Sequence, residues 1–240
     1  MPDAGRLAGR RALITGASGG LGREIHAALR AEGATCALLG RRDGGGGAIW
    51  IPADVSDAAA VGAAVEQAAA RLGGLDAVVC AAAVDCAWAP TGEMEIAEWD
   101  RTIAVNLSGT FYVCRAALPL LVAAGGGALV NVTSVAGLRA WADDVAYNAS
   151  KAGVELLTRT IAVEYGPLGV RANCVAPGDI DAGMSDAVTD PTERELMVAR
   201  HPVGRLGRAG EVAEAVVWLL SDASSFTTGA TLMVDGGFLA

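Results

Sequence analysis

Residues 11–22 read Arg-Ala-Leu-Ile-Thr-Gly-Ala-Ser-Gly-Gly-Leu-Gly, and the rest of the chain can be placed around them. The first five residues are a short apolar run typical of a buried strand, and a glycine-rich turn follows directly. Residues 23–32 then carry Ile25, Ala28 and Leu29 at helical spacing before Gly33 ends the pattern. The order strand, glycine turn, helix predicts the first unit of an α/β fold.

The glycines of this turn indicate a nucleotide site. Glycine lets the backbone turn tightly and come close to a pyrophosphate, which then rests on free N–H groups at the positive end of the helix. A glycine-rich turn also occurs in α/β proteins without a ligand. Its place between a strand and a helix favours dinucleotide binding here.

The remaining apolar patterns alternate between strands and helices. Strands are expected at 35–39, 48–51, 76–80, 128–133, 170–175 and 232–235, and helices at 57–72, 98–121, 146–165 and 211–220. Such alternation requires right-handed crossovers and a parallel sheet covered on both faces. The sequence therefore predicts a Rossmann-like, doubly wound α/β fold with seven parallel strands, in one catalytic domain over residues 1–240.

Composition narrows the classes of partner. The chain is 52% hydrophobic and 19% charged, with a net charge of −9, which argues against nucleic acid and anionic membranes and weakly against an acidic carrier protein. Residues 1–10 lack the apolar core of a signal peptide, and Pro119 and three glycines interrupt the longest charge-free run, 116–138. Five unpaired cysteines and two histidines offer no metal-ligand cluster. We expect a cytoplasmic protein without a metal.

The chain has 18 basic residues, and Lys151 is its only lysine. A retained ammonium group indicates a position where the planar guanidinium of arginine does not serve. Tyr147 stands four residues earlier, so both side chains can share one helix face. A nearby cation lowers the pKa of a phenol, which suits a tyrosine that acts as acid and base. An ordinary surface pair on a helix is the alternative.

The spacing Thr-Gly-x-x-x-Gly-x-Gly at residues 15–22 resembles the glycine motif of the short-chain dehydrogenase/reductase family, and the resemblance covers nearly the whole chain. Ser134, at the end of a predicted strand and thirteen residues before Tyr147, matches the catalytic serine of that family. The resemblance implies a catalytic set of Asn106, Ser134, Tyr147 and Lys151. Asn106 would bend its helix and hold a water of a proton relay, although a hydrogen-bonded core asparagine explains the sequence equally well.

The choice of cofactor depends on the end of the second strand. Gly40 stands where a carboxylate would bind the ribose 2′-hydroxyl of NAD, and Arg41 and Arg42 suit the 2′-phosphate of NADP. We therefore expect NADP(H), and Asp43 leaves NAD(H) open. Residues 43–47 are expected to form a glycine loop in place of a helix. By resemblance, Asp54 and Val55 flank the adenine.

Two positions depart from the family pattern. Residues 80–83 read Cys-Ala-Ala-Ala where the family has Asn-Asn-Ala-Gly, so the polar bonds that brace this strand must be made otherwise. Ala182 replaces a threonine that touches the nicotinamide amide, a contact left to the backbone or to Ser185. The predicted cofactor contacts are Gly16, Ser18, Gly19, Gly20, Leu21, Gly22, Gly40, Arg41, Arg42, Asp54, Val55, Ala81, Ala82, Ala83, Asn106, Tyr147, Lys151, Pro177, Gly178 and Ile180.

Substrate contacts are less constrained by the sequence. Residues 183–208 show no strong pattern, and residues from about 179 to 208 are expected to form a substrate lid. Apart from Ser134, which would bond the substrate oxygen, the candidate pocket residues are apolar, which favours a hydrophobic or aromatic ketone: Trp88, Met94, Leu138, Trp141 and Met184. Arg139 could pair with a substrate carboxylate or could face water.

The sequence thus predicts an NADP(H)-dependent oxidoreductase that interconverts a small-molecule ketone and a secondary alcohol. Alternatives are an NAD-dependent dehydrogenase of a cyclic diol or hydroxy acid, a 3-oxoacyl-carrier-protein reductase, and a dinucleotide-sensing regulator without turnover. Apolar stripes on the helices at 98–121 and 146–165 exceed what one sheet face needs, which favours a homodimer or homotetramer.

Overall fold

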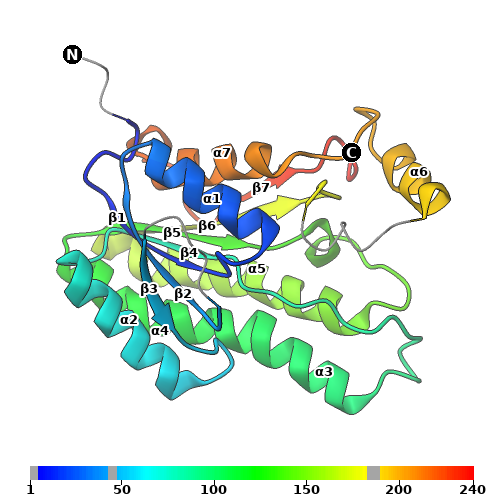
Figure 1. Cartoon of the computed structure of the whole chain (residues 1–240), viewed down its shortest axis with the longest axis horizontal. Helices are drawn as coiled ribbons and strands as arrows, with labels where there is room; N and C mark the ends of the chain where they lie inside the picture. Colours follow the sequence, from blue (N-terminus) through cyan, green and yellow to red (C-terminus); the bar gives the residue numbers. More distant parts are fainter. Residues whose placement is uncertain (1–4, 43–47, 183–189) are drawn as a thin grey trace.

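A parallel β-sheet forms the centre of the protein in the computed structural model, which describes residues 5–42, 48–182 and 190–240 (Figure 1). The strand order is β3-β2-β1-β4-β5-β6-β7, and every neighbouring pair is parallel. This confirms the predicted doubly wound sheet. The strands are β1 (Arg11–Thr15), β2 (Thr35–Gly40), β3 (Ile49–Pro52), β4 (Ala77–Cys80), β5 (Gly127–Val132), β6 (Val170–Pro177) and β7 (Thr231–Val234).

Helices cover both faces of the sheet (Figure 1). On one face α1 (Gly20–Ala31) packs beside α7 (Ala209–Leu220), and on the other α4 (Gly109–Ala123) lies between α2 (Ala58–Leu72) and α5 (Val145–Tyr165). Each layer encloses its own apolar core, because a sheet buried on both faces needs apolar side chains pointing both ways. Strands β1 and β4 are accordingly almost continuous runs of Ala, Val, Leu and Ile.

The order of the strands fixes where a ligand can bind. Strand β1 pairs with β2 on one side and with β4 on the other, so the chain winds in opposite directions from this point. Parallel α/β sheets bind ligands in the crevice outside the carboxyl ends of the strands at such a switch point. The glycine turn, residues 81–84 and Ser134 all follow strands at that edge.

The helix predicted at 98–121 is longer and is interrupted. It consists of α3 (Ile96–Ile103), a π-helical turn η1 (Ala104–Ser108) and α4, and Asn106 lies in the π-helical turn. By length and composition Ile96–Ala123 could cross a membrane. It is instead a core helix, because Val113, Ala117 and Leu121 are buried against the sheet.

The described part of the stretch after β6 contains a helix that the sequence analysis does not predict. Helix α6 (Pro191–Ala199) lies within the stretch predicted to lack a pattern, and Asp190 caps it by accepting a hydrogen bond from the Thr192 amide. Proline suits the first position of a helix, so Pro191 is a start signal here. A bridge between Ile180 and Gly207 joins both ends of the stretch. Residues 43–47 and 183–189, with Asp43, Met184 and Ser185, lie outside the described residues.

Three short 3-10 turns complete the described elements: η2 (Val135–Gly137), η3 (Gly166–Leu168) and η5 (Asp222–Ser224). The first of them follows β5 directly and has Ser134 as its N-cap residue. This placement turns the chain back over the end of the sheet and brings the residues before α5 toward the crevice.

Candidate active site

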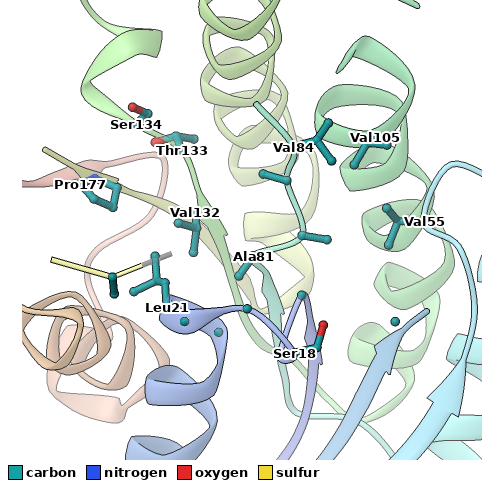
Figure 2. A pocket seen from close by; sticks show the side chains of 18 of the residues that line it. Ser18, Leu21, Val55, Ala81, Val84, Val105, Val132, Thr133, Ser134 and Pro177 are labelled. Carbon is teal, nitrogen blue, oxygen red and sulfur yellow. The ribbon is translucent and has the colours of Figure 1, made fainter. Parts of the chain in front are cut away.

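A cavity of about 420 Å³ runs along the carboxyl edge of the sheet. Figure 2 shows Ser18 and Leu21 of the glycine turn on one side, Val55, Val84 and Val105 on the other, and Ser134 at one end. The volume is in the range of small-molecule sites. Every predicted cofactor residue lines it except Asn106: Gly16, Ser18, Gly19, Gly20, Leu21, Gly22, Gly40, Arg41, Arg42, Asp54, Val55, Ala81, Ala82, Ala83, Tyr147, Lys151, Pro177, Gly178 and Ile180.

The glycine turn has the geometry of an anion cradle. Gly16 has φ +74°, and a Cβ there would lie 2.6 Å from the Ala81 carbonyl oxygen, so only glycine fits. A Cβ at Gly22 would overlap the Gly16 carbonyl. Gly19 caps α1 without a side chain, so the first N–H groups of the helix face the cavity with no capping partner. These features fit a dinucleotide pyrophosphate.

The far end of the cavity is lined by two arginines. Arg41 and Arg42 follow Gly40 at the end of β2, and the Arg41 side chain is 70% exposed. Its Nε lies 4.0 Å from Oδ2 of Asp54, whose other oxygen accepts hydrogen bonds from Ser56. Those bonds and the nearby guanidinium lower the pKa of Asp54. An exposed guanidinium without a close ion pair is free to bind a phosphate.

The missing asparagines of residues 80–83 are replaced from other elements. The hydroxyl oxygen of Thr15 accepts hydrogen bonds from the amides of Ala81 and Ala82, both at 3.2 Å. The Asn106 side chain binds Val84, accepting from its amide at 2.8 Å and donating to its carbonyl at 2.9 Å. The segment after β4 is therefore braced at both ends.

Asn106 does not line the cavity, contrary to the predicted cofactor contact. It is fully buried behind Val84, and its side-chain amide also donates to the Ser150 hydroxyl at 3.2 Å. Its backbone carbonyl, released by the π-helical turn, accepts from the Thr110 hydroxyl at 2.7 Å. A carbonyl oxygen has a second lone pair, so this group can still hold a water.

Ser134, Tyr147 and Lys151 line the same cavity as the glycine turn. The Ser134 side chain accepts from the Ala136 amide at 3.1 Å and lies close enough to the Tyr147 hydroxyl to lower its pKa. Lys151 is only 3% exposed, and its Nζ donates to the Val132 carbonyl at 3.0 Å. The same Nζ lies 5.4 Å from the centre of the Tyr147 ring. The predicted neighbours on one helix face are thus brought together with the serine.

The electrostatics of the pair differ from the prediction. Burial raises the pKa of Tyr147 well above its usual value of 10, and the nearby Asp85 and Asp144 add to this, while the Ser134 hydrogen bond opposes it. Burial also lowers the pKa of Lys151 to about 8. The expectation that Lys151 makes Tyr147 unusually acidic is therefore wrong for the protein alone. Desolvation is the largest cause of the raised pKa of Tyr147, and the Lys151 ammonium donates its hydrogen bond to the Val132 carbonyl.

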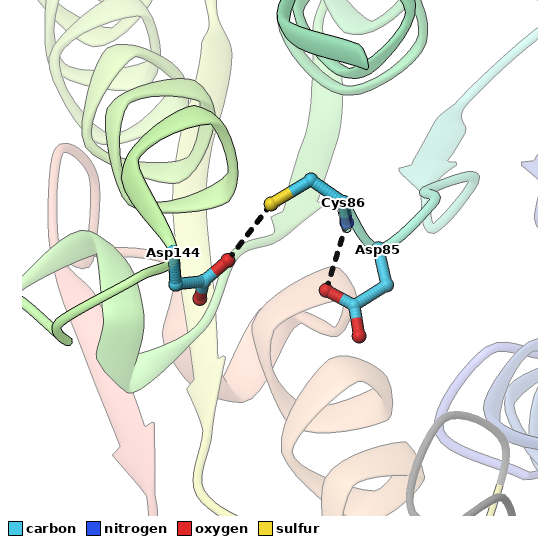
Figure 3. Close-up of side chains that lie close together, drawn as sticks. All are labelled: Asp85, Cys86 and Asp144. Carbon is cyan, nitrogen blue, oxygen red and sulfur yellow. Dashed lines mark hydrogen bonds between the residues drawn. The ribbon is translucent and has the colours of Figure 1, made fainter. Parts of the chain in front are cut away.

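A cluster that the sequence does not predict lies beside Tyr147. The Cys86 thiol donates to Asp144 at 3.1 Å, and the Cys86 amide donates to Asp85 at 3.0 Å (Figure 3). Burial raises the pKa of Asp144 to about 6. The ligand atoms of the three lie within 4.8 Å of one another, which corrects the expectation that no such group exists. The feature of the sequence that could have indicated this cluster is Asp144, an acidic residue three positions before Tyr147.

Of the predicted substrate residues, Ser134 lines the cavity, and Trp88, Met94, Leu138 and Trp141 do not. Trp88 is 67% exposed, and Leu138 is exposed on the turn after Ser134. Trp141 is half-buried and packs on Phe238, with ring centres 5.2 Å apart. Phe238 and the buried His201, both near this end of the cleft, were not predicted, because their neighbours are remote in sequence.

Comparison with known proteins identifies the family. A family model described as enoyl-(acyl carrier protein) reductase matches residues 16–239. Cis-4-hydroxycyclohexanecarboxylate dehydrogenase of Sinomonas cyclohexanicum is 41% identical over 98% of both chains. The chain belongs to the short-chain dehydrogenase/reductase family.

Other members of the short-chain dehydrogenase/reductase family match at similar length. D-threitol dehydrogenase of Mycolicibacterium smegmatis is 37% identical, covering 97% of this chain and 94% of the relative. The crystal structure of levodione reductase superimposes with a TM-score of 0.92 at 33% identity, covering 96% of this chain and 98% of that one. The chain is thus an oxidoreductase that acts on CH–OH or C=O groups and uses a nicotinamide cofactor.

Proposed function

We propose that the protein is an NADP(H)-dependent oxidoreductase that interconverts a ketone and a secondary alcohol, with Tyr147 as its acid and base. One observation carries the proposal most strongly. Ser134, Tyr147 and Lys151 line the same cavity as the glycine cradle, with the hydroxyls of Ser134 and Tyr147 in contact. A proton donor and an oxygen-binding group therefore face the space where a nicotinamide would lie.

The bound cofactor supplies or accepts the hydride at the substrate carbon. Tyr147 donates its phenolic proton to the carbonyl oxygen during reduction and removes the alcohol proton in the reverse direction. Ser134 donates a hydrogen bond to the same oxygen and stabilises the charge that develops on it. Lys151 would hold the nicotinamide ribose hydroxyls, and its ammonium, 5.4 Å from the centre of the Tyr147 ring, would partly offset the cost of forming the tyrosinate. The carbonyl of Asn106 holds the water that returns the proton to the site.

The high pKa of Tyr147 sets the dependence on pH. A phenol that stays protonated at neutral pH is ready to donate, so reduction should proceed at pH 7. Oxidation needs the tyrosinate and should become faster as pH rises toward the pKa of Tyr147. At neutral pH Tyr147 is therefore in the protonated form that ketone reduction requires.

The preference for NADP(H) is supported by Arg41 and Arg42 beside Gly40 at the end of β2. Both guanidiniums can bind a 2′-phosphate, and no carboxylate among the described residues 35–42 stands there to bind a 2′-hydroxyl. An NAD-dependent dehydrogenase of a cyclic hydroxy acid is the second candidate. The similarity to a hydroxycyclohexanecarboxylate dehydrogenase supports that candidate.

A panel of ketones and secondary alcohols tests the proposal, with NADPH and NADH each measured in both directions at pH 7 and pH 10. We expect ketone reduction with NADPH, and Arg41→Ala should lower kcat/KM for NADPH about tenfold or more while leaving NADH nearly unchanged. A higher kcat/KM with NADH would support the second candidate. Nucleotide binding without turnover of any ketone or alcohol would support a sensor and contradict an enzyme.

The assembly is proposed to be a homodimer or homotetramer built on α4 and α5. Phe111 on α4 and Leu156 and Val163 on α5 are exposed, and they lie on the layer that covers one face of the sheet. Large exposed apolar side chains on neighbouring helices are typical of an interface between subunits.

A further inference from the structure

Two arginines near the substrate end of the cleft have no acidic partner. Arg139 and Arg200 make no ion pair or hydrogen bond through their guanidiniums with any residue in the described ranges. Burial raises the pKa of the nearby Asp179, the charges of His201 and Arg200 oppose this, and Arg200 forms no ion pair with that carboxyl.

Both guanidiniums are held against one aromatic ring. The Cζ of Arg139 lies 5.5 Å from the centre of the Trp141 ring, and the Cζ of Arg200 lies 5.3 Å from it. Arg139 also lies 5.9 Å from the centre of Phe238. Stacking on a ring orders a guanidinium and leaves its N–H edge available for a planar anion.

The two arginines form one cluster with the rings of Trp141 and Phe238. One side of this cluster is hydrogen-bonded to residues next to the proposed catalytic residues. The amide of Arg139 donates to the Val135 carbonyl at 2.9 Å, which holds Arg139 within one turn of Ser134. The carbonyl of Trp141 accepts from the Asn148 side chain at 2.8 Å, and Asn148 follows Tyr147 in α5. Arg139 and Trp141 are therefore fixed between the serine and the tyrosine.

The other side is tied to the wall of the cofactor cavity. Arg200 precedes His201, whose Nε2 accepts from the Asp179 amide at 3.2 Å. A Cβ on cavity-lining Gly178 would lie 2.9 Å from the same nitrogen, so His201 packs directly on that wall. The Phe238 ring lies 5.2 Å from both the His201 and the Trp141 rings and joins the two sides.

We infer that Arg139 and Arg200 bind a carboxylate of the substrate, so that the protein acts on keto or hydroxy acids with an anionic group remote from the reacting carbon. The inference rests on the proposed function, because it places the substrate oxygen at Ser134 and Tyr147. Arginine binds carboxylates through two parallel N–H···O bonds, which fixes orientation as well as affinity. The two guanidiniums would thus orient the ketone carbon toward the proposed acid.

The test compares 4-oxocyclohexanecarboxylate with its uncharged methyl ester, using NADPH and NADH. Variants Arg139→Gln and Arg200→Gln are compared with the control Arg71→Gln, an exposed arginine at the end of α2 that is remote from the cleft. We expect each test variant to lower kcat/KM for the acid about tenfold or more, mainly through KM, and to leave the ester within about twofold. The control should change neither.

Equal use of acid and ester by the unmodified protein would overturn the inference, as would variants that lose both substrates alike. In either case the proposed function stands if ketones are still reduced. If neither ketone is reduced, calorimetry of the NADP⁺ complex with cyclohexanecarboxylate and with cyclohexanecarboxamide decides the matter. The inference is supported if cyclohexanecarboxylate binds, cyclohexanecarboxamide does not, and both test variants lose the binding of the carboxylate. Equal binding of the carboxylate and the amide refutes it.

Discussion

Lys151 shows how a single residue can be recognised from sequence while its effect is not. Its uniqueness and its spacing from Tyr147 indicate a special ammonium, and the structure buries it in the cavity wall. Its hydrogen bond runs to Val132, however, and burial dominates the pKa of Tyr147. The direction of a side chain and the exclusion of water around it depend on tertiary packing, which the local spacing of residues does not encode.

Replacing Lys151 by arginine tests the need for a compact ammonium. Lys151→Arg keeps the charge, but a planar guanidinium cannot fit the buried site and still donate to the Val132 carbonyl. We expect kcat/KM to fall about 100-fold or more, with a weaker Kd for NADPH. Steady-state kinetics and fluorescence titration measure both. Activity near the level of the unmodified protein would mean that only the charge matters.

Asp144 makes a prediction about stability and pH. Its pKa is raised from 3.8 to about 6 in the folded protein, so folding favours the protonated carboxyl. The unfavourable contribution of the Asp144 carboxyl to the free energy of folding is absent below about pH 4. It grows as pH rises to 6 and is constant above that pH. Asp144→Asn removes that cost and keeps an acceptor for the Cys86 thiol. We expect a stabilisation of about 2–3 kcal/mol at pH 8 that disappears near pH 4.

Thermal unfolding from pH 4 to pH 8 measures this effect. Asp143→Asn is the matched control, because Asp143 is exposed and its left-handed backbone (φ +63°) suits asparagine equally well. The control should not alter the dependence of Tm on pH. A constant difference between Asp144→Asn and the unmodified protein at all pH values would show that the Asp144 carboxyl does not titrate as described.

At the scale of elements, the π-helical turn η1 links the long helix to the cavity. Its Asn106 binds both polar backbone groups of Val84, which lines the cavity. Sequence resemblance predicted a bend at Asn106, and in the structure Asn106 lies in a π-helical turn and braces the segment after β4. Thr15 braces the other end of that segment from β1.

Asn106→Ala should therefore affect stability and cofactor binding together. Three hydrogen bonds to Val84 and Ser150 are lost in a buried site, which should cost about 2–4 kcal/mol of unfolding free energy. The Kd for NADPH should rise, because the cavity wall at Val84 loosens. Urea unfolding and fluorescence titration measure the two effects.

Asn173→Ala is the matched control for this element. Asn173 is equally buried and binds Thr227 and Ala230 at a distance from the cavity. The Asn173→Ala variant should lower the free energy of unfolding by a similar amount and leave the Kd for NADPH unchanged. If both variants weaken NADPH binding alike, the effect of Asn106 is general destabilisation and not local bracing.

The elements differ in how far the sequence predicts them. The glycine turn and α5 are predicted well, because their signals lie within a few consecutive residues. Helix α6 was missed because Pro191 was not recognised as a helix start. The contact of Cys86 with Asp144 joins residues 58 positions apart, and the aromatic cluster of Trp141, His201 and Phe238 joins three segments. Pairings of that range depend on the folded topology.

At the scale of the whole molecule, the exposed faces of α4 and α5 predict an assembly. Val163 is 78% exposed on α5, and Leu156 lies two turns earlier on the same helix. The double variant Leu156→Glu, Val163→Glu places charges on this face without disturbing the core. We expect light scattering to show a dimer or tetramer for the unmodified protein and a monomer for the variant. Circular dichroism checks that the variant is folded, and an unchanged mass would place any interface elsewhere.

The whole site combines a glycine cradle between β1 and α1 with the hydroxyls of Ser134, which follows β5, and of Tyr147 on α5. Tyr147→Phe removes one oxygen from that arrangement and keeps the ring. The most direct measurement is the reduction of a cyclic ketone by NADPH deuterated at the hydride position, with deuterium in the alcohol followed by mass spectrometry. The unmodified protein should transfer one deuterium, and Tyr147→Phe should lose at least about 1,000-fold in rate with an unchanged Kd for NADPH. Transfer by Tyr147→Phe at the unmodified rate would contradict the assignment of Tyr147 as the proton donor.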